Sequence, residues 1–187
     1  GMIVYLIGRR KDKLKETQNL CSGETEVLKC DVSDPQAVKN AFEIVEKDHS
    51  RLDVLFNNAG IGVPAHSIDE MPYENWKSVV DINLNGMFLC AKYAFALMRK
   101  QSPQGGRMIN NGSVSSVTPR PGSIPYTATK HGVTGMTKTI SLDGRKYDIC
   151  CSQINIGNAE TPMTERMKEG VPPVSYTHLT LPTTRHG

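Results

Sequence analysis

The stretch LDVLFNNAG, residues 52–60, decides the fold class of this chain. Residues 52–56 form a short, largely apolar run, which predicts a β-strand. The NNAG that follows consists of small and polar residues, which suit a turn at the end of a strand. A strand of this kind is typical of a parallel sheet with both faces covered. The segments on either side follow the same pattern.

Four further strands are predicted, and helical patterns separate them. The predicted strands are residues 2–7, 25–30, 107–110 and 149–156. Helices are predicted at residues 11–21, from the Ser-Asp-Pro start at residue 33 onward, at 73–100 and at 126–143. This alternation predicts an α/β protein with a Rossmann-like, doubly wound parallel sheet and right-handed crossovers.

Length and composition exclude several classes of protein. The 187 residues suffice for one medium domain, and a net charge of +3 gives no reason to expect nucleic acid as a partner. No apolar run reaches the ~20 residues of a membrane helix and no signal peptide is visible, so we expect no membrane partner. The five cysteines include no C-x-x-C pair, and the five histidines lack metal-ligand spacing. We therefore expect a cytoplasmic protein without a metal site.

Small and polar residues follow every predicted strand. They are Gly8-Arg9-Arg10, Asp31-Val32, Asn57 to Gly60, Asn111-Gly112-Ser113 and residues 157–161. In an open parallel sheet, ligands bind beyond the carboxyl ends of the strands. One such end would mean little because loops are polar anyway, but the recurrence at all five favours a shared ligand groove.

Residues 126–130, YTATK, carry the sharpest local signal. Positions i and i+4 of a helix share a face, so the phenol of Tyr126 and the ammonium of Lys130 can both point into the groove. A nearby ammonium favours the phenolate form of a tyrosine, which prepares it to exchange a proton with an alcohol or carbonyl oxygen. The alternative interpretation is a surface Tyr–Lys pair.

Four motifs together resemble those of the short-chain dehydrogenase/reductase family. N-N-A-G occurs at Asn57 to Gly60, N-x-x-G at Asn83 to Gly86 and Y-x-x-x-K at Tyr126 to Lys130, and Ser113 precedes the tyrosine by thirteen positions. The resemblance covers about residues 2–173. It implies an oxidoreductase that transfers a hydride between a nicotinamide cofactor and a carbonyl or alcohol substrate.

The resemblance implies catalytic roles for four residues. Tyr126 would be the general acid in carbonyl reduction and the base in alcohol oxidation, and Lys130 would hydrogen-bond the nicotinamide ribose. Ser113 would hydrogen-bond the substrate oxygen, and Asn83 would hold a water that relays protons through Lys130. The alternative is a binding or regulatory module on the same fold, which would not need to retain these four residue types.

The resemblance also implies cofactor contacts. Besides Tyr126 and Lys130, the residues concerned are Arg9, Asp31, Val32, Asn57, Ala59, Gly60, Ala159 and Thr161. Gly8 stands where an acidic residue would accept hydrogen bonds from ribose hydroxyls, and Arg9 follows it. Because a guanidinium suits a phosphate, we expect NADP rather than NAD. The alternative is that Arg9 and its basic neighbours form a solvated helix start.

Parts of the family pattern are missing from the sequence. No strand with a glycine-rich turn precedes residue 2, although this turn would bind the pyrophosphate. Since the family's first strand lies in the middle of the sheet, we expect the strands at 2–7 and 25–30 to lack a neighbour that connects them to the strand at 52–56. We therefore expect residues 1–173 to be an incomplete domain, truncated at both ends and inactive as it stands.

The last residues differ in character from the rest. Residues 174–184, VSYTHLTLPTT, resemble a translation of the adapter used in sequencing libraries, so we expect a non-native tail at 174–187. The alternative is a genuine disordered tail.

The resemblance implies a homodimer or homotetramer for the full-length protein, formed through the long helices. Met87, Phe88, Phe95 and Met98 fit such an interface, and core packing explains them equally well.

Overall fold

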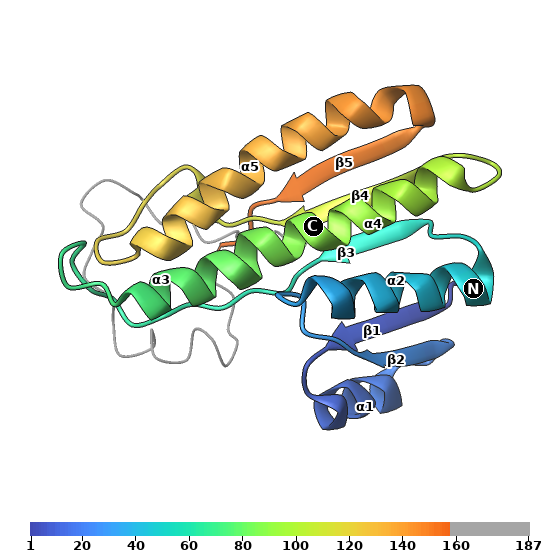
Figure 1. Cartoon of the computed structure of the whole chain (residues 1–187), viewed down its shortest axis with the longest axis horizontal. Coiled ribbons are helices and arrows are strands. Elements are labelled where there is room, and N and C mark those ends of the chain that lie inside the picture. The colour runs from blue at the N-terminus through green and yellow to red at the C-terminus, as the bar shows by residue number, and fades with distance from the viewer. Residues whose placement is uncertain (158–187) are drawn as a thin grey trace, which may run out of the picture. The chain divides into compact units, whose positions relative to one another are not determined.

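Strands and helices alternate along the chain, as the sequence predicts (Figure 1). The computed structural model describes residues 1–157, so the predicted boundary at residue 173 and the predicted tail lie outside the described residues. The strands are β1 (Val4–Gly8), β2 (Thr25–Lys29), β3 (Val54–Asn57), β4 (Gly106–Asn111) and β5 (Ile149–Ile154). The α-helices are α1 (Lys11–Leu20), α2 (Pro35–His49), α3 (Tyr73–Val80), α4 (Met87–Lys100) and α5 (Ile124–Gly144). Three short turns of helix are η1 (Asp81–Gly86), η2 (Val114–Ser116) and η3 (Arg145–Tyr147).

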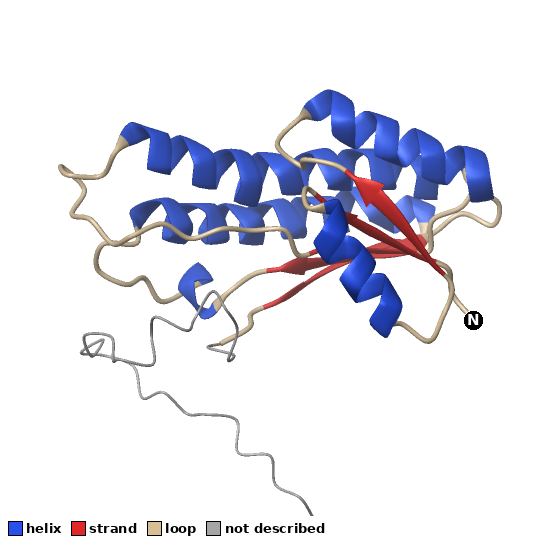
Figure 2. Cartoon of the chain, turned by 90° about the horizontal axis from the view of Figure 1, so that it is seen from below, coloured by secondary structure: helices blue, strands red, loops and turns tan. Residues whose placement is uncertain are grey.

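All strand pairs are parallel, and they form two sheets. β1 pairs with β2, while β3, β4 and β5 form a second sheet in that order. α2, α4 and α5 lie over one face of the strands and α1 lies on the other side, as in a doubly wound fold (Figure 2). Within residues 1–157 no strand joins β1 to β3, and the truncation that the sequence analysis expects stays a prediction.

A shared core connects the two sheets through α2 and α4. The core combines Cys30 after β2 with residues of both helices, Met108 of β4 and Ile149 of β5. α2 begins where the sequence predicts, because the carboxylate of Asp34 accepts hydrogen bonds from two backbone N–H groups of the first turn. Buried at helical spacing along α2 are Val38, Ala41, Phe42 and Val45.

The helix predicted over residues 73–100 is interrupted by a π-helical turn. This turn, η1, separates α3 from α4. Its last residue, Gly86, packs closely on the segment after β2: a Cβ at this position would lie 2.8 Å from Cγ2 of Val32. The long helix therefore changes its hydrogen-bond pattern where it passes the end of the first sheet. Such turns occur frequently at functional sites.

Candidate active site

Lys130 lies in a buried position on α5. The side chain is 4% exposed, and its Nζ donates a hydrogen bond of 2.7 Å to the backbone carbonyl of Asn111, the last residue of β4. Burial lowers the pKa of the Lys130 amine to about 8, because desolvation disfavours the charged form. An amine held in this way can gain or lose a proton near neutral pH.

Tyr126 lies one helical turn before Lys130, near the start of α5. Lys130 Nζ is 5.4 Å from the centroid of the Tyr126 ring. Tyr126 is half-buried, and Thr129 between them is buried and donates a 2.8 Å hydrogen bond to the Tyr126 carbonyl. The two functional groups thus share the inward face of the helix, which rules out the alternative of an exposed surface pair.

Ser113 follows β4 and begins η2, which contacts α5. Its Oγ accepts a hydrogen bond of 3.1 Å from the backbone N–H of Ser115. Within the described part of the chain, the hydroxyl proton of Ser113 has no acceptor. The hydroxyl is therefore fixed through its oxygen and can still donate to an incoming oxygen atom.

Asn83 lies in the π-helical turn and is fully buried. Its Oδ1 accepts a 2.8 Å hydrogen bond from the N–H of Ile61, and its Nδ2 donates one of 2.9 Å to the Ile61 carbonyl. Asn83 thereby fastens the loop after β3 to the long helix. Each end of the amide thus makes one hydrogen bond to the backbone of Ile61.

A cavity of about 240 Å³ lies at the carboxyl ends of β1 and β2. Five of the residues predicted to contact the cofactor line this cavity. These are Arg9, Asp31, Val32, Ala59 and Gly60. Arg9 Nη1 lies 4.0 Å from Asp31 Oδ2. Hydrogen bonds from Ser33 and then the charge of Arg9 lower the pKa of Asp31 against an opposing effect of burial, so this wall carries both a carboxylate and cations.

Some predicted residues lie elsewhere. Asn57 does not line the cavity: it is buried, and its Nδ2 donates a 3.0 Å hydrogen bond to Asn110 of the neighbouring strand. Tyr126 and Lys130 are not among the cavity's lining residues either. Ala159 and Thr161 lie outside the described residues.

Sequence reasoning missed other lining residues of the cavity. They include Arg10, Lys13, Leu14 and Ile82. Lys13 lies one helical turn after Arg9 and Arg10 in the sequence. This helical spacing could have predicted that the three cations lie on the same side of α1.

Two further features bear on whether these residues fit a nicotinamide dinucleotide: an unpaired buried oxygen of Asn111 and the glycine-rich turn that the family pattern places before a helix. Oδ1 of Asn111 is buried without a hydrogen-bond partner among residues 1–157. The same residue holds Lys130 through its carbonyl and donates 2.7 Å to Oδ1 of Asn58. A buried, unpaired acceptor next to Lys130 fits a hydroxyl donor such as that of a ribose. In the described residues, no glycine-rich turn opens a helix, so residues 1–157 lack the kind of turn that would hold a pyrophosphate.

Several known proteins are similar to this chain. Residues 1–172 match the profile of the family described as short chain dehydrogenase. A 3beta-hydroxysteroid dehydrogenase of Mediterraneibacter gnavus is 34% identical over 169 residues, which cover 89% of this chain and 60% of that protein. An acetoacetyl-CoA reductase of an Acinetobacter species is 30% identical over 173 residues, which cover 91% of this chain and 68% of that protein. The solved structure of ElxO with NADP bound superposes with a TM-score of 0.80 at 28% identity, covering 89% of this chain and 68% of that one.

The fold and the site together define an α/β protein of the Rossmann type with a tyrosine and a buried lysine at the carboxyl ends of its strands. The chain belongs to the short-chain dehydrogenase family, as its motifs predict. It spans 60% of the length of the M. gnavus relative.

Proposed function

We propose that the complete protein is an oxidoreductase that interconverts a carbonyl and an alcohol, with Tyr126 as the acid and base. The observation that carries this proposal is the buried amine of Lys130, 5.4 Å from the Tyr126 ring on the same helix face. A bound nicotinamide cofactor would supply or accept the hydride. The family relatives that are named dehydrogenases and reductases support this assignment.

Each of the other polar residues has a role in proton transfer or orientation. The free hydroxyl proton of Ser113 would be donated to the substrate oxygen, where negative charge develops during reduction. The Tyr126 phenol would then give its proton to that oxygen, and Lys130 would stabilise the phenolate left behind. The backbone of Asn83 would hold the water that returns a proton by way of Lys130.

The charge around the cavity favours NADP over NAD. Arg9, Arg10 and Lys13 line it, whereas Gly8 offers no carboxylate at the end of β1. Guanidinium and ammonium groups attract a 2′-phosphate, and a carboxylate at Gly8 would repel it. NAD is the alternative, because Asp31 already lies 4.0 Å from Arg9 and offsets part of its charge.

The Tyr126→Phe variant tests the proposed function. In the complete gene product, removal of the phenol hydroxyl should abolish carbonyl reduction while NADPH still binds, since Tyr126 is outside the cavity near Arg9. Turnover and fluorescence titration of NADPH measure the two properties. Unchanged turnover would contradict the assignment of Tyr126, and normal NADPH binding by a wild-type protein that reduces no carbonyl would favour a binding module.

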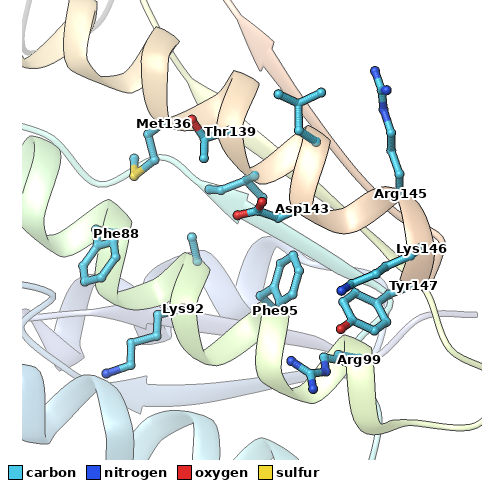
Figure 3. A pocket seen from close by; sticks show the side chains of 13 residues that line it. Phe88, Lys92, Phe95, Arg99, Met136, Thr139, Asp143, Arg145, Lys146 and Tyr147 are labelled. Carbon is cyan, nitrogen blue, oxygen red and sulfur yellow. The ribbon is translucent and has the colours of Figure 1, made fainter.

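We also propose that α4 and α5 form the interface of a homodimer or homotetramer. A groove of about 860 Å³ lies between them, in which Phe88 of α4 lies opposite Met136 of α5 and Phe95 lies near Asp143 and Tyr147 (Figure 3). Of the four apolar residues that the sequence analysis named for an interface or for core packing, Met87 and Met98 lie in the core. Phe88 is 53% exposed and is available for an interface. Both signs of charge border the groove, which allows a second copy to pair with it.

A surface charge tests this interface. Phe88→Asp should shift the complete protein toward monomers in light scattering after gel filtration, while Val117→Asp, at an exposed position outside the groove, should not. An unchanged mass for Phe88→Asp would contradict the interface.

We also propose a cytoplasmic location. All five cysteines are free thiols, which is the state that a reducing compartment maintains.

A further inference from the structure

Gln153 on β5 connects the two elements that carry the proposed catalytic groups. Its Nε2 lies 3.0 Å from Oγ1 of Thr134 on α5, 2.6 Å from Oδ1 of Asn155 and 3.4 Å from Oγ of Ser116 in η2. Gln153 and Asn155 are two positions apart on an extended segment, so their side chains lie on the same face. A single amide group therefore contacts both α5 and the segment after β4 that contains η2.

On the loop side, the contacts of Gln153 lead to Ser113. Asn155 Oδ1 is also 3.0 Å from the hydroxyl of Ser116. That hydroxyl lies 2.5 Å from the backbone carbonyl of Ser113. Gln153 thus supports, through Asn155 and Ser116, the backbone of the residue whose hydroxyl is proposed to contact the substrate.

On the helix side, the contacts of Gln153 lead to Lys130. Thr134 lies one turn after Lys130, and its Oγ1 donates to the Lys130 carbonyl at 3.4 Å. Oε1 of Gln153 lies 3.4 Å from Oγ1 of Thr137, a buried hydroxyl that donates its proton to the Val133 carbonyl at 2.8 Å. Both ends of the Gln153 amide therefore engage the face of α5 that bears the lysine.

The backbone next to Ser113 leaves little room for this amide to move. A Cβ at Gly112 would lie 2.6 Å from Nε2 of Gln153 and would also collide with Oδ1 of Asn155. The amide is thus enclosed between Gly112, which directly follows β4, and the helix that carries Lys130. Its position depends on its hydrogen bonds and on this enclosure together.

We infer that Gln153 is a positioning residue, which holds Ser113 at a fixed distance from the Tyr126–Lys130 face of α5. The inference rests on the proposed function, because it concerns the arrangement of that site. Gln153 acts through Asn155, Ser116 and Thr134 and touches no reacting atom in this scheme. Since small displacements of reacting groups reduce rates strongly, its loss should lower the rate of the chemical step rather than the binding of the cofactor.

Two substitutions separate the hydrogen bonds of Gln153 from its volume. Gln153→Met keeps the length and removes all polar contacts, and Gln153→Glu keeps the shape and removes the amide protons that reach Thr134 and Asn155. Ser152→Ala is the matched control, because Ser152 is on the same strand but on its opposite, exposed side. All three are made in the complete gene product.

Two measurements decide the role. Both Gln153 variants should lower kcat by about tenfold or more while the dissociation constant of NADPH stays unchanged, because a misplaced reacting group slows the chemistry. Hydrogen exchange, measured by mass spectrometry on the same proteins, should be faster in residues 112–117 and unchanged in β1 and α1. Ser152→Ala should match the wild type in both measurements.

Unchanged kcat together with unchanged exchange at residues 112–117 would overturn the inference. Equal losses of kcat, cofactor affinity and thermal stability would also overturn it, because they indicate a general structural defect. If the wild-type protein reduces no carbonyl, the proposed function fails, and the exchange measurement still decides whether Gln153 holds the Ser113 segment.

Discussion

At the scale of single residues, the most consequential feature is an amine that is almost fully buried. Lys130 gains one hydrogen bond of 2.7 Å in exchange for its hydration, and it has no carboxylate partner within residues 1–157. Burying a lysine without an opposite charge destabilises the folded state when the amine is protonated. This burial is the feature on which the proposed role of Lys130 in proton transfer rests.

Replacing Lys130 should change how stability depends on pH. The folded chain holds this proton less tightly than the unfolded chain, with a pKa of about 8 against the ordinary 10.5. The wild type is thus destabilised below pH 8 and recovers stability as the pH rises through 8 toward 10.5. The Lys130→Met variant has no amine at this position, so it should not gain this stability as the pH rises. The free energy of unfolding of the variant minus that of the wild type should therefore fall by about 3 kcal/mol between pH 7 and pH 10.5.

Urea denaturation at a series of pH values measures this difference. Lys138→Met is the control, because Lys138 is an exposed lysine on the same helix. A stability difference between Lys130→Met and wild type that does not vary with pH would show that the amine titrates normally.

Replacing Arg9 should change the choice of cofactor. Arg9→Ser removes a guanidinium from the cavity wall, and a charged hydrogen bond of this kind contributes about 1.5–3 kcal/mol. In the complete protein, kcat/KM for NADPH should therefore fall by about tenfold to a hundredfold while the value for NADH stays the same. Lys11→Ser is the control, because Lys11 also begins α1 but does not line the cavity. Equal losses with both cofactors would argue against a phosphate contact.

At the scale of secondary-structure elements, the π-helical turn organises the site. It places Asn83 against Ile61 and Gly86 against Val32, so one turn of helix holds the loops after both β3 and β2. The carboxyl ends of two sheets that are not paired with each other are thereby tied to a single helix. The turn thus supports both the cavity lined by Arg9 and the loop that follows β3.

Gly86→Ala should destabilise the protein, because the added methyl group would lie 2.8 Å from Cγ2 and 3.0 Å from the carbonyl of Val32. Overpacking of this kind costs about 1–3 kcal/mol. Gly135→Ala is the control: Gly135 is on the exposed side of α5 with nothing within 4 Å, and the better helix propensity of alanine should stabilise by about 0.5–1 kcal/mol. Thermal unfolding measures both. Equal effects of the two substitutions would contradict the close approach at Gly86.

Local signals explain why the elements were predictable and the turn was not. The apolar run at 52–56 and the Ser-Asp-Pro start of α2 depend only on neighbouring residues, and both appear as predicted. The π-helical turn instead lies against Val32 and Ile61, which are distant in sequence. Similarly, the N-N-A-G motif could not tell that the side chain of Asn57 bonds to Asn110 instead of facing the cavity.

At the scale of the whole molecule, the strands of residues 1–157 are divided between two sheets. The unpaired edges of β1 and β3 expose apolar residues, of which Phe56 is 51% exposed. Exposed strand edges favour association with other chains. The cavity lined by Arg9 and Asp31 lies at the carboxyl ends of the strands of the first sheet. Lys130, in contrast, is hydrogen-bonded to β4 of the second sheet.

The 187-residue chain should therefore bind NADPH poorly and aggregate on concentration. Isothermal titration and light scattering measure these properties. The complete gene product, examined in parallel, should bind NADPH with ordinary affinity and stay dispersed. Micromolar binding of NADPH by the 187-residue chain would contradict the expectation that the divided sheet prevents function.

The weak attachment of β1, α1 and β2 also has a consequence for folding. α1 buries no residue completely, and the strands beside it pair only with each other. These first thirty or so residues depend on α2 and α4 for their connection to the rest, so they can open as a separate cooperative unit at a lower free energy than global unfolding. Proteolytic nicking should therefore begin in this part of the chain, and the fragment left behind would keep its tyrosine and lysine side by side.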